Sequence, residues 1–149
     1  MPLSLPKFRS HDYKFLVQRW RRICKESGLK MKKILVLDHF PYFEVSSPII
    51  GKRDIIYLSA GIHGDESAST EGLLAWAQQN LDKLQSLPLL IYPCLNPWGL
   101  QNNSRFDAKG IDLNRVWSNP KNILIKHIFN RTKALHFQTV INLHEDFDG

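Results

Sequence analysis

The fold is decided by residues 54–84, which read DIIYLSAGIHGDESASTEGLLAWAQQNLDKL. Residues 54–60 form a short run that is mostly apolar or β-branched, as in a strand. Residues 61–65 follow as a turn that contains two glycines. Residues 66–84 carry apolar side chains at the spacing of a helix that packs on a sheet. These positions are Ala68, Leu73, Leu74, Ala77, Leu81 and Leu84. The stretch therefore predicts a strand, a turn and a helix in succession.

The alternation extends towards the N-terminus. Apolar residues recur at helical spacing after Ser10, which can cap a helix, and Gly28 is placed to end that helix. Two short apolar runs follow at 34–37 and 42–45, and each is bounded by turn residues. We expect one amphipathic helix and two strands before residue 54.

Towards the C-terminus, residues 88–95 form a near-continuous apolar run, which is typical of a central strand covered on both faces. Residues 96–116 form a loop that we expect to be too polar for the core. Pro120 suits the first turn of a helix with Asn119 as a possible cap. Residues 139–143 then predict another buried strand. Strands that alternate with helices predict an α/β domain with helices on both faces of a mixed, largely parallel sheet.

The composition narrows the classes of function. The formal charge is +6, from 20 Lys and Arg against 14 Asp and Glu, with basic residues concentrated at 19–22 and 30–33. This charge could indicate a nucleic-acid partner, but no nucleic-acid motif accompanies it, so we interpret it as solvated faces of a helix and a strand. Cys24 and Cys94 lack the spacing of a disulfide scaffold, and we expect both to be core thiols.

No stretch approaches the roughly 18 apolar residues that span a bilayer, and the segment after Met1 lacks the apolar region of a signal peptide. We therefore expect a cytoplasmic protein with no membrane partner. At 149 residues the chain has the length of one domain.

His63, Glu66 and His144 predict a zinc site. A catalytic zinc ion needs three nitrogen or carboxylate ligands and one open position, and two His with one Glu is a known set. His63 and Glu66 follow one predicted strand, and His144 follows another. Open α/β sheets bind ligands at the carboxyl ends of their strands, so these side chains could converge. A single histidine at a strand end is more often structural, so the prediction rests on the combination of the three residues.

The loop between these residues reads Asn96-Pro97-Trp98-Gly99, then Arg105, then Gly110-Ile111-Asp112-Leu113-Asn114-Arg115. With His-x-x-Glu before it and a distal His after it, this ordered series resembles the zinc metallocarboxypeptidases of the carboxypeptidase A superfamily. That superfamily includes the branch of succinylglutamate desuccinylase and aspartoacylase-like enzymes. The resemblance covers residues 32–149. We expect residues 1–149 to form one domain, in which residues 1–30 are an N-terminal helical segment.

The resemblance implies one Zn²⁺ per chain, held by His63, Glu66 and His144. It implies that Arg105 polarises the scissile carbonyl and that Asn114 and Arg115 hold the free carboxylate of the substrate. The residue types suit these roles, because an arginine fork can hold a carboxylate through two parallel hydrogen bonds and zinc acts as a Lewis acid.

The roles of Asn114, Arg115 and Asp65 have alternatives. For Asn114 and Arg115, the alternative is a loop turn with a surface ion pair to Asp112 or Asp107. Asp65 could accept a hydrogen bond from a metal-bound imidazole or could be a surface charge. Glu145 follows His144 directly and should point to the opposite side, so we do not expect it to be a ligand.

The resemblance also implies a catalytic Glu on a later strand, and no residue after His144 matches it. We therefore expect the family domain to be C-terminally incomplete here and poorly active. The leading hypothesis is a zinc-dependent hydrolase that cleaves an amide next to a free carboxylate, in a peptide or an N-acyl amino acid. The alternative is a non-catalytic module that binds zinc or a carboxylate.

Overall fold

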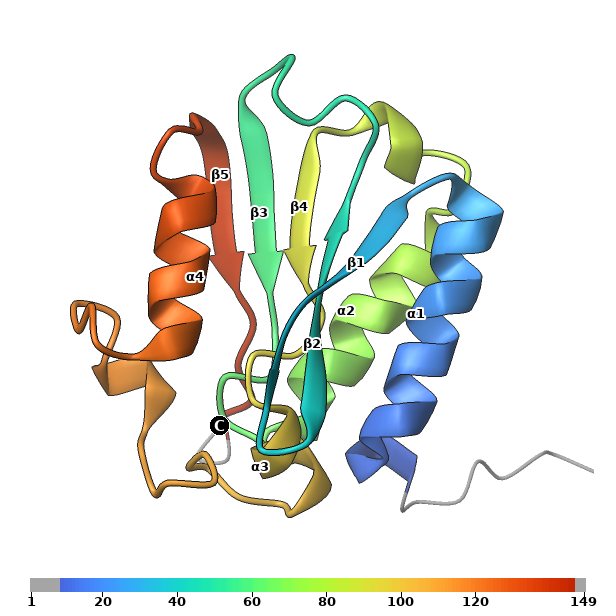
Figure 1. Cartoon of the computed structure of the whole chain (residues 1–149). Coiled ribbons are helices and arrows are strands. Elements are labelled where there is room, and N and C mark those ends of the chain that lie inside the picture. The colour runs from blue at the N-terminus through green and yellow to red at the C-terminus, as the bar shows by residue number, and fades with distance from the viewer. Residues whose placement is uncertain (1–8, 147–149) are drawn as a thin grey trace, which may run out of the picture.

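The computed structural model describes residues 9–146 and contains a five-stranded sheet with helices on both faces (Figure 1). The strands are β1 (Lys30–Leu37), β2 (Phe40–Ser46), β3 (Ile55–Ser59), β4 (Leu89–Tyr92) and β5 (Phe137–Asn142). The α-helices are α1 (Tyr13–Ser27), α2 (Ser67–Gln79), α3 (Pro97–Gln101) and α4 (Ile123–Thr132). Short 3₁₀ turns lie at Arg9–His11, Leu84–Ser86 and Leu113–Arg115.

The strand order across the sheet is β1-β2-β4-β3-β5. The pairs β1·β2 and β2·β4 are antiparallel, whereas β3 pairs in parallel with both β4 and β5. The mixed α/β sheet predicted from the alternation is thus confirmed. Since β3 and β5 run in the same direction, the chain leaves both strands at the same edge of the sheet.

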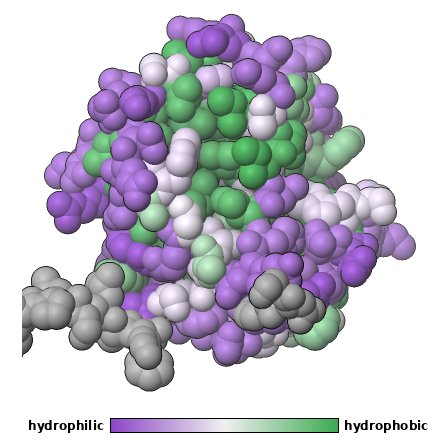
Figure 2. Space-filling model, turned by 180° about the vertical axis from the view of Figure 1, so that it is seen from behind, coloured by the Kyte–Doolittle hydropathy of each residue, from purple (hydrophilic) through white to green (hydrophobic). Residues whose placement is uncertain are grey.

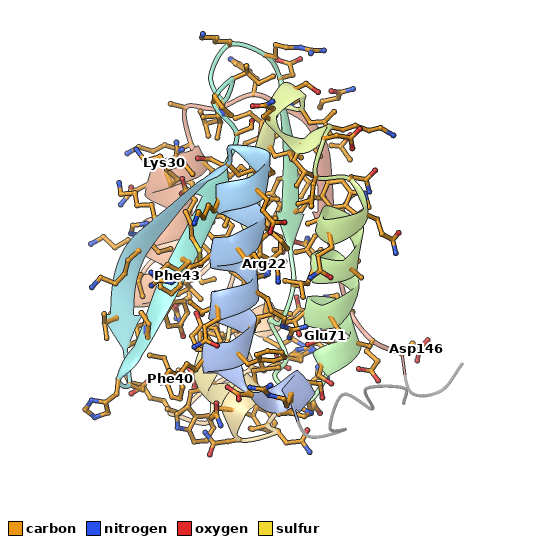
Figure 3. The ribbon with its side chains drawn as sticks, turned by 90° about the vertical axis from the view of Figure 1, so that its right-hand side faces the viewer. Arg22, Lys30, Phe40, Phe43, Glu71 and Asp146 are labelled. Atoms are coloured by element: carbon orange, nitrogen blue, oxygen red, sulfur yellow. The ribbon has the colours of Figure 1, made fainter. Side chains whose placement is uncertain are left out.

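Alternate side chains of β3 enter two separate cores. Leu58 joins the core under α1 and α2, while Ile55 and Tyr57 join the core under α4. Helices α1 and α2 lie side by side on one face of the sheet (Figure 3). Arg19 of α1 forms an ion pair with Glu71 of α2. The central strand β4 is buried along its whole length, as the apolar run 88–95 predicts.

Both ends of helix α1 have clear physical causes. Its N-cap is Asp12, whose side chain accepts a hydrogen bond from the amide of Phe15, so the prediction of Ser10 as the cap is wrong. Gly28 ends the helix as predicted, with a φ of 79° that favours glycine over other residues. Cys24 and Cys94 are both buried free thiols, as expected.

Two other expectations need correction. Helix α4 begins at Ile123 with Asn122 as its cap, three residues after Pro120, so Asn119 is not the cap. The loop 96–116 is not entirely polar surface, because it begins with the largely buried helix α3. The side chain of Asn96 caps this helix by accepting a hydrogen bond from the amide of Gly99. Its apolar residues Pro97 and Leu100 are buried as well.

Strand β5 is exposed, although residues 139–143 predict a buried strand. It lies at the end of the strand order, so only β3 pairs with it within residues 9–146. Ile141 is 43% exposed. Seen from behind, hydrophobic side chains gather in a patch (Figure 2), and a cavity of about 250 Å³ on this face is lined by Ile141, Trp76 and Leu87. No helix within the described part of the chain is long and apolar enough to cross a membrane.

Candidate metal centre

His63, Glu66 and His144, here called the triad, meet at the edge of the sheet where β3 and β5 end. His63 lies in the turn after β3, Glu66 is the N-cap residue of α2, and His144 lies two residues after β5. His63 and Glu66 are 3% and 6% exposed, and the side chain of His144 is 37% exposed. The triad is therefore buried on the protein side and open to solvent at His144.

The two histidines face opposite oxygens of one carboxylate. Nδ1 of His63 lies 2.8 Å from Oε1 of Glu66, and Nδ1 of His144 lies 2.9 Å from Oε2. One ligand atom from each of the three residues lies within 4.8 Å of the others. The structure thus brings together the three residues that the sequence predicts as metal ligands.

The donor set fits a zinc ion. Imidazole nitrogen and carboxylate oxygen are zinc ligands, and in a tetrahedral site ligand atoms lie about 3.4 Å apart. Within the triad, two pairs of atoms lie closer than this, at 2.8 Å and 2.9 Å. All three ligand atoms lie within 4.8 Å of one another, an outer limit that is wider than the separation that zinc needs. Small side-chain movements would be enough to accommodate the ion.

Asp112 holds the far side of His63. Nε2 of His63 lies 3.0 Å from Oδ1 of Asp112, whose side chain is 15% exposed. Both ring nitrogens of His63 therefore face a carboxylate oxygen, Nε2 that of Asp112 and Nδ1 that of Glu66. With a metal ion on Nδ1, Nε2 would keep its hydrogen and donate it to Asp112. A carboxylate behind a metal-binding imidazole fixes its orientation in this way.

Sequence reasoning misses this contact of Asp112, which it considers only as an ion-pair partner of Asn114 and Arg115. It names Asp65 as a possible acceptor for a metal-bound imidazole, and the structure contradicts that alternative. Oδ1 of Asp65 is buried and has no hydrogen-bond partner among residues 9–146. The available signal was the position of Asp112 inside the Gly-Ile-Asp-Leu-Asn-Arg motif.

Both carboxylates that contact His63 remain ionised. Burial alone would raise the pKa of Glu66, but hydrogen bonds from His63, the amide of Glu145 and His144 outweigh it and lower the pKa. Burial likewise opposes ionisation of Asp112, and hydrogen bonds from His63, Arg105 and the amide of Asn114 lower its pKa. Two anionic groups thus flank one buried imidazole, which favours binding of a cation.

The turn that carries His63 is held by a close backbone contact. A Cβ on Gly64 would lie 1.9 Å from the carbonyl carbon of Gly99 and 2.2 Å from the amide nitrogen of Leu100. Only glycine allows this approach, so the turn after β3 packs directly on helix α3. The glycine within His-Gly-Asp-Glu therefore positions His63 and Glu66 on either side of it.

Arg105, predicted to be catalytic, and Asn114 and Arg115, predicted to bind substrate, are linked to the triad through Asp112. Nε and Nη2 of Arg105 each lie 3.0 Å from Oδ2 of Asp112. Arg115 is exposed, with Nε 4.0 Å from the same oxygen, so the alternative of an ion pair to Asp112 is observed at the outer limit. The amide of Asn114 donates to Asp112, and its side chain lines a cavity of about 360 Å³.

Glu145 does not join the ligand set, in line with expectation. Its Oε2 accepts a hydrogen bond from the amide of Ala68 in the first turn of α2. Its own amide donates to Oε2 of Glu66 at 3.3 Å. Glu145 therefore ties the end of β5 to the start of α2 and supports Glu66 through the backbone.

Comparison with known proteins agrees with the motifs. The model of the succinylglutamate desuccinylase/aspartoacylase catalytic domain matches residues 53–146. Two relatives named cytosolic carboxypeptidase 1 come from Danio rerio and Gallus gallus. The first is 36% identical over 93 residues, covering 57% of this chain and 8% of the relative. The second is 30% identical over 153 residues, covering 95% of this chain and 12% of the relative.

A solved structure shows the same fold. A candidate metallopeptidase from Shewanella denitrificans matches with a TM-score of 0.80 and 22% identity, covering 92% of this chain and 54% of that chain. This chain therefore spans about half the length of the solved protein and about a tenth of the length of the two relatives.

Proposed function

The chain belongs to the succinylglutamate desuccinylase/aspartoacylase catalytic-domain family, and from that membership we propose a zinc-dependent hydrolase of the metallocarboxypeptidase type. Its reaction is the cleavage of an amide bond next to a free carboxylate. The observation that carries this proposal is the triad itself. Three ligand atoms lie within 4.8 Å of one another, and Asp112 supports the most buried of them.

In this proposal His63, Glu66 and His144 hold one Zn²⁺. When bound, the ion supplies Lewis acidity to a carbonyl oxygen and lowers the pKa of bound water. His63 and Glu66 form the buried side of the site, and His144 lies at its open side. A substrate would therefore approach from the side of His144.

Arg105 is proposed to polarise the scissile carbonyl. Asp112 fixes its guanidinium at one edge through Nε and Nη2, and the side chain is 39% exposed. N–H groups outside this contact remain available as donors. An arginine that is held at one edge presents its remaining donors in a fixed direction, which favours a developing oxyanion.

Asn114 and Arg115 are proposed to hold the free carboxylate of the substrate. Both are exposed, and Arg115 contacts Asp112 only at 4.0 Å, so its guanidinium can turn towards a ligand at little cost. An arginine fork next to an amide donor suits a carboxylate in a peptide or in an N-acyl amino acid. The names of the family and the two relatives correspond to these two substrate classes.

A second candidate function is a non-catalytic module that binds zinc or a carboxylate. It is favoured by the bonding of the carboxylates around the site. Glu66 bonds both histidines, Asp112 bonds His63 and Arg105, and Glu145 caps α2. None of these three groups is free to act as a general base for a substrate water.

The metal content of the purified chain tests the proposal first. We expect about one zinc ion per chain after dialysis, and loss of that ion in both His63→Ala and His144→Ala. His127→Ala on α4 is the matched control and should keep the metal. A folded wild-type chain without zinc, or a control that loses zinc equally, would contradict the assignment of the triad.

Activity assays separate the two candidate functions. The zinc-loaded chain is incubated with peptides that carry a free C-terminal carboxylate and, separately, with N-acyl amino acids. The release of free amine is measured. Turnover that disappears in Arg105→Ala supports the hydrolase, whereas zinc binding with no turnover on either panel supports the binding module. We also propose a cytoplasmic location, which is supported by the word cytosolic in the names of the two relatives.

A further inference from the structure

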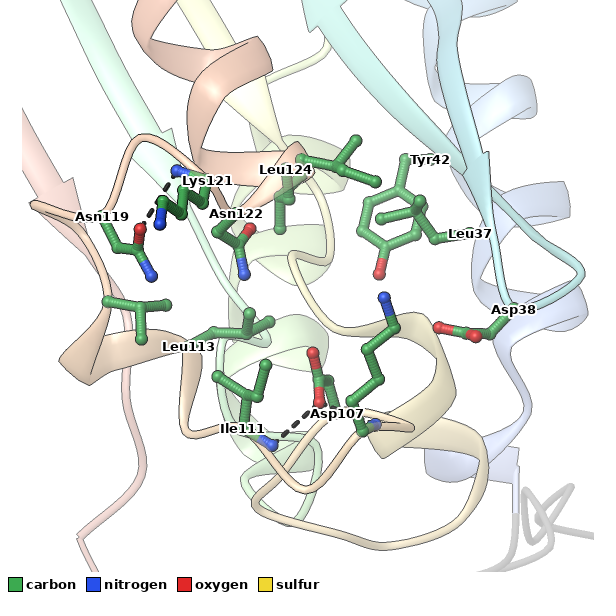
Figure 4. A pocket seen from close by; sticks show the side chains of 13 residues that line it. Leu37, Asp38, Tyr42, Asp107, Ile111, Leu113, Asn119, Lys121, Asn122 and Leu124 are labelled. Carbon is green, nitrogen blue, oxygen red and sulfur yellow. Dashed lines mark hydrogen bonds between the residues drawn. The ribbon is translucent and has the colours of Figure 1, made fainter.

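A second cavity lies on the other side of the loop that carries Asp112. It encloses about 310 Å³ between the β1–β2 hairpin, the segment 107–116 and the start of α4 (Figure 4). Apolar side chains, including Leu37, Ile111 and Leu124, form much of its wall. Its volume lies within the usual range for small-molecule sites.

The hydroxyl of Tyr42 points into this cavity (Figure 4). Tyr42 is 5% exposed, and its hydroxyl forms no hydrogen bond with any of residues 9–146. The pKa of Tyr42 is raised, chiefly by burial and further by the acidic groups Cys94, Asp107 and Asp38. The hydroxyl therefore stays protonated. It is thus a donor that no acceptor among the described residues occupies, and it faces the cavity, where an acceptor on a ligand can bind it.

The start of helix α4 opens into the same cavity. The side chain of Asn122 accepts a hydrogen bond from the amide of Ile125. The amides of Ile123 and Leu124 lie in the first turn of α4, where a helix offers no backbone acceptor to its amides. These amides and the helix dipole favour an anion. Asn119, Lys121 and Asn122 line this end of the cavity (Figure 4).

The carboxylates in the lining do not cancel this preference. Oδ1 of Asp107 already accepts from the amides of Lys109 and Ile111, both at 2.9 Å. Asp38 is exposed in the turn of the β1–β2 hairpin. Lys109 and Lys121 balance these two charges, so the helix terminus and the Tyr42 hydroxyl provide an excess of donors.

We propose that this cavity binds a small molecule through an oxyanion, either a carboxylate or a phosphate group. Its donors are the hydroxyl of Tyr42, the ammonium of Lys121 and the first amides of α4. The apolar wall accommodates the body of the ligand. The site is separate from the triad, and its existence does not depend on the proposed hydrolase.

Titration of the ¹⁵N-labelled 149-residue chain tests the site. Inorganic phosphate and acetate are added separately at constant ionic strength, and the amide shifts of Ile123 and Leu124 are followed. We expect saturable shifts with at least one of the two ions, and the ion that saturates identifies the oxyanion. Tyr42→Phe should weaken binding about tenfold or more, because it removes a hydrogen bond to a charged group.

Two lysine variants control for the overall charge of the chain. Lys121→Ala should weaken binding, whereas Lys25→Ala on α1 should leave it unchanged. Shifts that fail to saturate with both ions would overturn the proposal, and so would equal affinity in Tyr42→Phe. Equal weakening by Lys25→Ala and Lys121→Ala would also overturn it, since general electrostatics would then explain the binding. Lys121 is exposed, so its variant tests the site even if Tyr42→Phe does not fold.

Discussion

Replacing Asp112 by Asn should weaken zinc binding without removing a metal ligand. The carboxylate lies 3.0 Å from Nε2 of His63 and 3.0 Å from Nε of Arg105, and its side chain is only 15% exposed. Asn keeps the shape and one acceptor but loses the charge. The variant therefore isolates the electrostatic support of His63.

The expected loss can be estimated from this geometry. A hydrogen bond to a charged group contributes about 1.5–3 kcal/mol, and low exposure limits screening by solvent. This corresponds to roughly 10- to 100-fold in the zinc dissociation constant, which agrees with the usual effect of removing the carboxylate behind a metal-binding histidine. Competition against a chelating dye, at fixed pH and ionic strength, measures the constant.

Asp107→Asn is the matched control, because it makes the same change in charge on the same loop. Oδ1 of Asp107 accepts two backbone amides and does not contact the triad. We expect its zinc affinity to stay within about twofold of the wild type. Unchanged affinity in Asp112→Asn, together with loss of zinc in His63→Ala, would refute the role given to Asp112. Equal weakening in both Asn variants would point to net charge instead.

Three further predictions concern stability. Because the pKa of Glu66 is lowered from 4.5, its ionised form stabilises the fold above that pH and this contribution is lost as the pH falls through the lower folded value. Urea unfolding at decreasing pH should show the loss, and Glu66→Gln should flatten it. Gly64→Ala should destabilise the fold by about 3 kcal/mol in the same urea assay, because the new Cβ meets backbone atoms. Gly72→Ala should stabilise the fold by about 0.5–1 kcal/mol, because no atom lies within 4 Å of its Cβ. Arg131→Met leaves the buried Glu44 without its cation and should cost about 2 kcal/mol in thermal unfolding, and adding Glu44→Gln should recover part of that loss. An unchanged melting temperature in Arg131→Met would argue against this ion pair.

The sequence predicted those elements whose signal is local. Residues 54–60 contain β3, whose side chains alternate between two cores. Gly28 ends α1 because its backbone conformation favours glycine. The exposure of β5 could not be predicted, because an apolar run does not reveal how many strands pair with it. The burial of α3 was missed for a similar reason, since Asn96 is polar in sequence but becomes buried by capping its own helix.

At the site, the prediction of three converging ligands rested on strand ends, and the structure brings those ligands together. The choice between Asp65 and Asp112 could not be made this way. Asp65 lies between His63 and Glu66 in the sequence, whereas Asp112 is 49 positions from His63 and reaches it only through the fold. Neighbourhood in sequence is a poor guide to which carboxylate faces an imidazole, because side-chain direction depends on local backbone conformation.

The orientation of the triad depends on the segment 96–112 as much as on the strands. Gly64 packs against the backbone of Gly99, so helix α3 fixes the turn that carries His63. The same segment returns Asp112 to the far nitrogen of His63, and the side chain of Asn96 lies 3.5 Å from the carbonyl oxygen of Arg105. The proposed metal site is thus preorganised by residues outside the triad. Changes that loosen α3 should therefore lower zinc affinity while all three ligands remain in place.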